Sequence, residues 1–160
     1  MKKFIAILAA ALVGTAAIAQ DSGWSVGGSI DFASFKGAGS SFVFAPDIVY
    51  ALNDTFNVGA TMSFEKNAWD FAPYVCYYFG GNEKAYFFAD AFVDLWSEKD
   101  PVSKDRYTSW GVGVDAGIEI ALTDRFCIDL YFGNIGYDAD AESFGFNIGP
   151  AKNITFYYSF

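Results

Sequence analysis

Apolar and polar residues alternate along most of the chain beyond residue 23, and this alternation predicts β-strands. Strand side chains point to opposite faces in turn, so each alternating segment has one apolar and one polar face. Clusters of Asn, Asp and Gly separate the segments and are typical of turns. We predict eight strands, at Trp24–Phe35, Phe42–Leu52, Phe56–Phe64, Trp69–Phe79, Phe87–Leu95, Ser109–Leu122, Phe126–Phe132 and Pro150–Phe160.

The last predicted strand stays apolar to the final residue. Ile154, Phe156, Tyr158 and Phe160 share one face, and polar residues mostly occupy the other. Chain ends usually fray and are polar. A transmembrane barrel must instead pair its last strand with its first, so its final residues must be structured. This ending favours a closed barrel.

The connections between the predicted strands alternate in length. Short turns follow the second, fourth and sixth strands, whereas longer charged loops are predicted at Ser97–Tyr107 and Ile135–Gly149. In outer-membrane barrels the short turns face the periplasm and the longer loops face the exterior. An even number of strands then places both ends of the barrel domain on the periplasmic side.

The acidic residues within the strands all fall on the polar face. An ionised side chain facing lipid at the bilayer midplane costs about 2–4 kcal/mol, which is enough to enforce such sorting. We therefore interpret the polar face as the barrel lumen, although a soluble sandwich shows the same alternation with its faces exchanged. The candidate lumen acids are Asp31, Asp47, Glu65, Asp70, Asp90, Asp94, Asp115, Glu119 and Asp129.

The placement of aromatic residues favours the membrane alternative. Trp, Tyr and Phe gather near both ends of the predicted strands, and smaller residues such as Ala60, Ala91 and Val114 lie between them. Two aromatic bands are typical of membrane interfaces, whereas a soluble core would place its bulk in the middle. The sequence thus predicts an all-β fold, an eight-stranded antiparallel up-and-down transmembrane β-barrel with short periplasmic turns and longer extracellular loops.

The N-terminal residues have the pattern of a secretory signal. Lys2 and Lys3 precede the apolar run 4–13, and Ala17 and Ala19 supply the small residues that a signal peptidase requires. The run is too short to span a bilayer, which takes about 20 residues. We predict a cleaved signal peptide at residues 1–19 and one barrel domain at residues 20–160, exported to the outer membrane of a Gram-negative bacterium.

Charge and chemistry exclude several classes of function. The net formal charge is −9, and −11 without Lys2 and Lys3, so nucleic acid is a poor partner. The chain has no histidine, which removes Ser-His-Asp catalysis and imidazole metal sites. We predict no enzyme, no catalytic residue, no cofactor and no metal centre.

Two further features concern the predicted lumen. Cys76 and Cys127 lie on the fourth and seventh strands, nearly across the barrel, which is too far for a disulfide. We predict two free thiols. Several inward positions are glycines, which we interpret as room for water: Gly27, Gly59, Gly111, Gly113 and Gly117.

A doubled phrase, Phe44–Tyr50 and Phe71–Tyr77, begins with Phe-Ala-Pro in both copies. With this phrase and the Gly111–Gly117 repeat of alternating Gly, the chain resembles the small outer-membrane β-barrel proteins of Bacteroides-type bacteria, which share the architecture of OmpA- and OmpX-type barrels. The resemblance covers residues 20–160 and implies no catalytic motif. Pro46 and Pro73, at equivalent places, suggest a paired bulge or local kink.

The resemblance also implies a role for the last strand in biogenesis. Ile154, Phe156, Tyr158 and Phe160 look like the C-terminal assembly signal that the barrel-assembly machinery reads. The expected partners are therefore outer-membrane lipid and, during biogenesis, this machinery. A monomer is expected, and the sequence identifies no extracellular partner.

Three functional hypotheses remain open. The first is a structural or surface-interaction barrel whose acidic, hydrated lumen is plugged, since eight strands enclose little more than their own side chains. The second is a porin-like, narrow cation-preferring channel or a cation-binding lumen, because no basic residue within the strands shares the face of the acids. The third is a secreted soluble barrel of lipocalin type.

Overall fold

The computed structural model describes residues 23–35, 39–65, 67–82, 84–100, 103 and 105–160. Within the strands, the side chains of residues 30–35, 39–42, 44 and 150–153 are outside this description, as is the predicted signal peptide. No helix among the described residues is long and apolar enough to cross a bilayer. The strands are β1 (Trp24–Phe35), β2 (Gly39–Ala51), β3 (Phe56–Phe64), β4 (Ala68–Asn82), β5 (Ala85–Lys99), β6 (Arg106–Ala121), β7 (Phe126–Asp138) and β8 (Ser143–Ser159).

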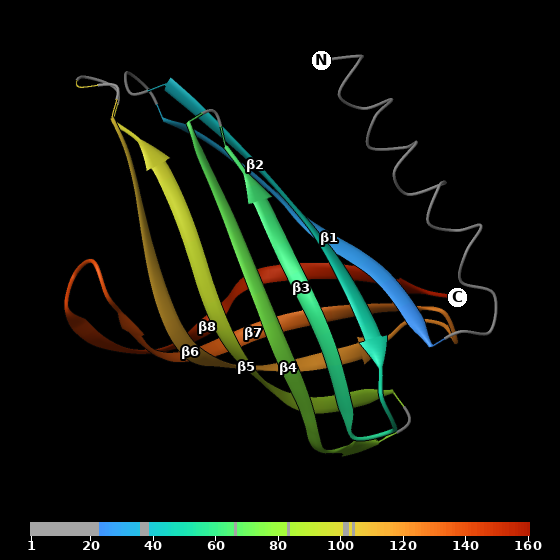
Figure 1. Cartoon of the computed structure of the whole chain (residues 1–160). Helices are drawn as coiled ribbons and strands as arrows, with labels where there is room; N and C mark the ends of the chain where they lie inside the picture. Colours follow the sequence, from blue (N-terminus) through green and yellow to red (C-terminus); the bar gives the residue numbers. More distant parts are fainter. Residues whose placement is uncertain (1–22, 36–38, 66, 83, 101–102, 104) are drawn as a thin grey trace.

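The eight strands form a closed antiparallel barrel in which each strand pairs with its neighbours in the chain (Figure 1). The predicted all-β fold, an eight-stranded antiparallel up-and-down barrel, is therefore confirmed. The first and last strands meet at one end, where the backbone N–H of Phe160 donates to the carbonyl of Trp24 at 3.1 Å. We call this end, which also carries the turns after β2, β4 and β6, the turn end. The opposite end is the hairpin end.

Two predicted loops at the hairpin end are largely strand, so this part of the prediction is wrong. β5 and β6 continue to Lys99 and from Arg106, and β8 begins at Ser143 rather than at Pro150. The connections are only 100–105 and 139–142. Charged residues in the β5–β6 hairpin and glycines in the β7–β8 hairpin weaken the apolar–polar alternation there. The sequence pattern therefore ends before the backbone pairing does.

Apolar side chains face outward and polar side chains face the lumen. Ile48, Val75 and Val93 are 43–44% exposed on the outside, whereas Asp47 and Asp129 are at most 7% exposed inside. This is the reverse of a soluble barrel, whose apolar face would be enclosed. The sheet is therefore built to present an apolar outer wall.

Aromatic rings form a contact series around the turn end. On the outer wall Tyr77 lies between Phe56 and Phe79, with ring centroids 5.1 and 6.1 Å away, and Phe79 continues to Phe87 at 6.3 Å. Further pairs in this band are Trp24–Tyr50, Phe126–Phe156 and Tyr158–Phe160. At the hairpin end, Trp110 contacts Tyr137 at 6.1 Å. The rings lie where the sequence predicts two bands.

The repeated prolines do not produce bulges. Pro46 and Pro73 keep their registers with Gly28 and Ala60. On the other side of each proline, the β2–β3 and β4–β5 pairings are interrupted without a register shift, because proline has no N–H to donate. The register shifts lie instead at Phe79 and Phe132, so the paired bulge is wrong, and the local kink stays a prediction.

The closure between β1 and β8 is short. Within the described residues it has four paired positions, from Ser25 opposite Ser159 to Gly28 opposite Phe156. The hydroxyls of Ser25 and Ser159 lie 2.9 Å apart in this seam. β8 continues past the seam as a hairpin with β7. There the outward Phe146 and Ile148 are about 70% exposed, and none of the described pairings joins this part of β8 to β1.

Candidate lumen site

Two cavities lie in the described part of the lumen, one toward each end of the barrel. The cavity toward the hairpin end has a volume of about 460 Å³, and the one toward the turn end about 490 Å³. The first is lined by the candidate lumen acids Asp47, Asp70, Asp90, Asp94 and Asp115, and the second by Asp90, Glu119 and Asp129. Seven of the nine candidate acids thus line the cavities.

The other two candidates stand apart. Asp31 lies in β1 opposite Val43, and its side chain is outside the described part of the structure. Glu65 follows the end of β3 and is exposed, with its N–H donating to the carbonyl of Ala68 at 3.0 Å. Its assignment to a strand is wrong, because the chain turns toward β4 directly after Phe64.

A layer of hydrogen-bonded side chains separates the two cavities. Asp47, on β2, accepts from the hydroxyls of Thr61 at 2.6 Å, Tyr74 at 3.0 Å and Tyr157 at 3.1 Å. Three donors on three different strands therefore converge on one carboxylate. Hydrogen bonds to a charged acceptor are stronger than neutral ones, so this layer fixes the middle of the lumen.

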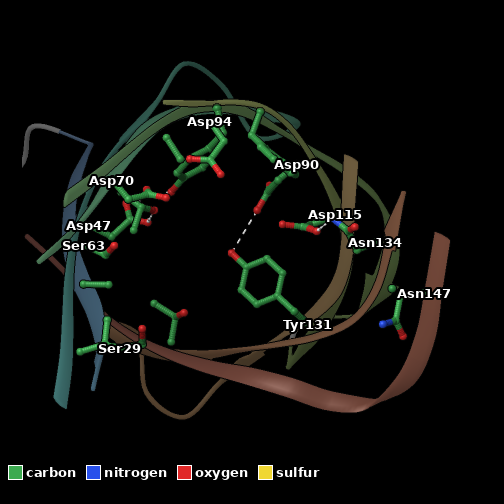
Figure 2. A pocket seen from close by; sticks show the side chains of 18 of the residues that line it. Ser29, Asp47, Ser63, Asp70, Asp90, Asp94, Asp115, Tyr131, Asn134 and Asn147 are labelled. Atoms are coloured by element: carbon green, nitrogen blue, oxygen red, sulfur yellow. Dashed lines mark hydrogen bonds between the residues drawn. The ribbon is translucent and has the colours of Figure 1, made fainter. Parts of the chain in front are cut away.

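The layer continues across the barrel through Asp90. Tyr131 donates to Asp90 Oδ2 at 3.0 Å (Figure 2). The ring of Tyr131 also packs against the fully buried Phe88, at a centroid distance of 5.2 Å. Tyr74 and Asp90 line both cavities. The lumen is thus divided at this level by aromatic rings and carboxylates.

The inward glycines make room for these rings rather than for water. A Cβ on Gly27 or Gly117 would fall within the ring of Tyr157 or Phe88, respectively. The pairs lie directly opposite each other on neighbouring strands: Gly27–Tyr157, Gly59–Tyr74, Gly113–Phe92 and Gly117–Phe88. The interpretation of these glycines as space for water is therefore wrong.

The lumen acids lie together without basic partners. Among the described residues, no lysine or arginine lines either cavity. Asp70 on β4 and Asp94 on β5 lie near each other on neighbouring strands, and both line the hairpin-side cavity (Figure 2). The Oδ1 atoms of Asp90, Asp94 and Asp129 are buried and have no hydrogen-bond partner within the described part of the chain.

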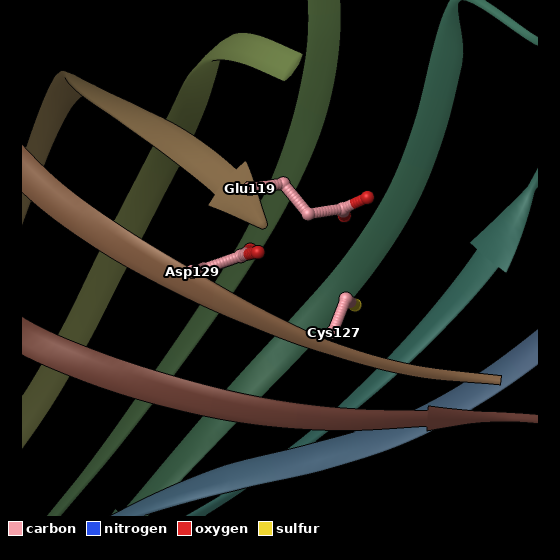
Figure 3. Close-up of side chains that lie close together, drawn as sticks. All are labelled: Glu119, Cys127 and Asp129. Carbon is pink, nitrogen blue, oxygen red and sulfur yellow. The ribbon is translucent and has the colours of Figure 1, made fainter. Parts of the chain in front are cut away.

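The turn-side cavity places a thiol near two acids. Glu119 on β6 lies directly opposite Asp129 on β7, and Cys127 is two residues before Asp129 on the same face (Figure 3). One donor atom from each residue lies within 4.8 Å of the other two. Tyr78 donates to Glu119 Oε2 at 2.8 Å. Cys127 and Cys76 are both free thiols, as predicted.

Sequence reasoning placed these side chains inward but did not find their partners. The contacts of Thr61, Tyr74 and Tyr157 with Asp47 join strands that are not all neighbours, and strand tilt determines which residues share a level. The alternation along a strand predicts which face of the sheet a side chain is on. It does not predict how far along the barrel axis the side chain lies. The four residues of the expected assembly signal lie elsewhere, outward on β8 or at its end.

The fold matches solved structures of small β-barrels. It superimposes on Neisserial surface protein A (NspA) with a TM-score of 0.58 and 19% sequence identity, over 87% of this chain and 98% of that chain. Ail, the attachment invasion locus protein of Yersinia pestis, matches with a TM-score of 0.40 and 15% identity, over 84% and 91% of the two chains. No protein-family model and no curated protein matches the sequence.

Proposed function

We propose that this chain is an integral outer-membrane β-barrel of a Gram-negative bacterium with a structural or surface-interaction role. The sorting of side chains carries the proposal: an apolar outer wall with aromatic rings near both ends encloses a lumen of carboxylates and hydroxyls. Such an exterior suits hydrocarbon and not water. NspA, which has the same fold, is a surface protein by its name.

The hairpin end carries the surface that would contact a partner in the proposed role. The β5–β6 hairpin reaches Lys99 and Arg106, beyond the top of β7, which pairs with β6 only as far as Gly111. There Ser97 is fully buried, because Arg106, Thr108 and the carbonyl of Tyr107 all bond to its hydroxyl. A stiff, polar hairpin of this kind is suited to contact a partner outside the membrane.

Membrane fractionation combined with a heat-modifiability gel tests the membrane assignment. The protein is expected in the outer-membrane fraction, and its unboiled band is expected to migrate differently from its boiled band because the closed barrel resists detergent. Recovery in the soluble periplasmic or extracellular fraction would contradict the assignment and favour the lipocalin-type alternative.

The layer around Asp47 supports a plugged lumen over a channel. It closes the space between the two cavities with Tyr74, Tyr157 and Phe88. Purified protein in planar bilayers is expected to give no reproducible conductance steps. Replacing both tyrosines (Tyr74→Ala with Tyr157→Ala) is expected to join the cavities and produce small cation-selective steps.

The second candidate function, a narrow cation-preferring channel, has one observation in its favour. The acids line both cavities and no described basic residue opposes them, so a permeating cation would meet a continuous negative surface. Cation-selective steps from the unmodified protein would establish this function in place of the plugged lumen.

A further inference from the structure

We propose that Glu119, Cys127 and Asp129 form a binding site for a zinc-class divalent cation in the turn-side cavity. The inference goes beyond the proposed role, because it needs only the folded barrel and neither a surface partner nor conduction. It also departs from the sequence-based prediction of no metal centre.

The first argument is the mutual placement of the two carboxylates. Glu119 and Asp129 are direct cross-strand partners that face the same lumen. Like charges directly opposite each other destabilise a strand pair. A pair of this kind inside a barrel is stabilised by a cation between the two groups.

The second argument is an orphaned acceptor. Asp129 is 6% exposed, and its buried Oδ1 has no hydrogen-bond partner among the residues that the structure describes. Figure 3 shows its carboxylate pointing into the space that it shares with Glu119 and Cys127. Leaving a buried charged acceptor without a partner is costly, so this atom is available as a ligand.

The third argument is the donor set, which selects the class of metal. One thiol and two carboxylates offer a soft sulfur with two hard oxygens, a combination that suits zinc and not calcium or magnesium. A tetrahedral zinc holds such donors about 3.3–3.8 Å from one another. The present spacing within 4.8 Å therefore closes by about an ångström of side-chain movement.

The surroundings orient the site and leave it accessible. Tyr78 donates to one oxygen of Glu119 at 2.8 Å, and Asn57 donates to the Tyr78 hydroxyl at 3.3 Å. Second-layer hydrogen bonds of this kind hold metal ligands in place. The cavity of about 490 Å³ extends to Asn53 and Asp54 at the turn end, which gives the cation a polar entry path.

Cobalt binding by the refolded protein tests the site. Co²⁺ is a spectroscopic substitute for zinc, and its bond to a thiolate adds a near-ultraviolet charge-transfer band. Chelator-treated protein in detergent, with its fold checked by heat modifiability, is expected to bind one Co²⁺ per chain with this band. Added Zn²⁺ should displace it, whereas millimolar Ca²⁺ or Mg²⁺ should not.

Matched variants assign the ligands. Cys127→Ser is expected to abolish the charge-transfer band, and Asp129→Asn or Glu119→Gln to weaken Co²⁺ binding at least tenfold. Cys76→Ser removes the other thiol of the same cavity and should leave the band intact, as should Asp115→Asn in the other cavity.

Several outcomes would overturn the proposal. The proposal is wrong if the folded protein binds no Co²⁺. It is also wrong if Cys127→Ser leaves the charge-transfer band unchanged, or if Ca²⁺ displaces Co²⁺ as effectively as Zn²⁺ does. Because the heat-modifiability gel reports the barrel separately, loss of metal binding is distinguishable from failure of the proposed function.

Discussion

At the scale of single residues, the lumen is built from pairs of glycine and aromatic side chains. Each of four glycines lies opposite a ring on the neighbouring strand, so the ring lies flat where a Cβ would stand. Rings that cover glycines in this way protect the backbone and help to fix strand register. The glycines therefore leave space for aromatic rings, as the proposed plugged lumen requires.

Gly117→Ala tests this role. Its Cβ would meet the ring of Phe88 and lie 3.0 Å from the carbonyl oxygen of Leu130, and Phe88 is fully buried and has no room to yield. We expect destabilisation by about 1–3 kcal/mol, as for other overpacked interiors. The measurement is urea unfolding followed by the gel-mobility shift. Gly145→Ala, with no atom within 4 Å of the added Cβ, is the control and should be neutral.

At the scale of strands, alternation was sufficient for the existence and faces of all eight elements. β1 and β3 begin and end at the predicted residues, although Glu65, which was counted with the third strand, lies outside it. β8 was predicted seven residues too short, because Gly145 and Gly149 interrupt the apolar signal of Phe144, Phe146 and Ile148. This segment is a strand because its backbone pairs with β7. The residues of the segment alone do not predict that pairing.

The sequence did not predict which lumen residues lie at the same height along the barrel axis. Parity placed Asp47, Tyr74 and Tyr157 inward, but their meeting depends on the tilt and register of several strands. The Glu119–Cys127–Asp129 cluster shows the same limit. Two of its members are two residues apart, whereas the third joins them only through the β6–β7 register.

A designed disulfide tests the seam between β1 and β8. Ser25 and Ser159 are direct cross-strand partners, next to Trp24 and Phe160, which are joined by a backbone hydrogen bond. In an antiparallel sheet the pair next to a hydrogen-bonded pair is of the non-hydrogen-bonded type, with Cα atoms about 4.5 Å apart. Ser25→Cys with Ser159→Cys, in a background without Cys76 and Cys127, is expected to oxidise readily in the folded barrel.

The readout is a thiol-labelling gel of the folded protein before and after reduction. Pairing Ser159→Cys with Asn53→Cys provides a control at the same end of the barrel but on elements that are not neighbours. Equal crosslinking of both pairs would contradict the assigned seam.

Removal of Phe160 separates two roles of the last strand. Its N–H bonds to Trp24 and its ring contacts Tyr158, so it contributes modestly to the closed barrel. If the terminal residues are also the assembly signal, deletion should lower the amount of folded protein in cells more than it lowers the unfolding temperature of the barrel that forms. Leu122→Ala, at an exposed position of the same end, controls for lost apolar surface. An equal loss of both quantities would reduce Phe160 to a packing role.

At the scale of the whole molecule, the barrel is an apolar wall around a negative interior. Its tryptophans report this arrangement directly, because Trp24, Trp69 and Trp110 are outward and 37–48% exposed. Trp96, in contrast, lies on the lumen side of β5, against Gly111.

Fluorescence quenching by lipids with brominated acyl chains is expected to distinguish the two groups. In variants that retain one tryptophan and replace the others by phenylalanine, the three outward residues should be quenched strongly and Trp96 weakly. Strong quenching of Trp96 with weak quenching of the others would show that the barrel does not present its apolar face to lipid.

The short seam also determines when the barrel can be completed. Ser25 and Ser159 are separated by 134 residues, whereas the other strand pairs are formed by neighbours in the chain. Contacts between distant segments carry the largest loop-closure entropy, so the seam forms after the hairpins. Until then the lumen acids line an open sheet, and the cavities come into existence only with the final four pairings.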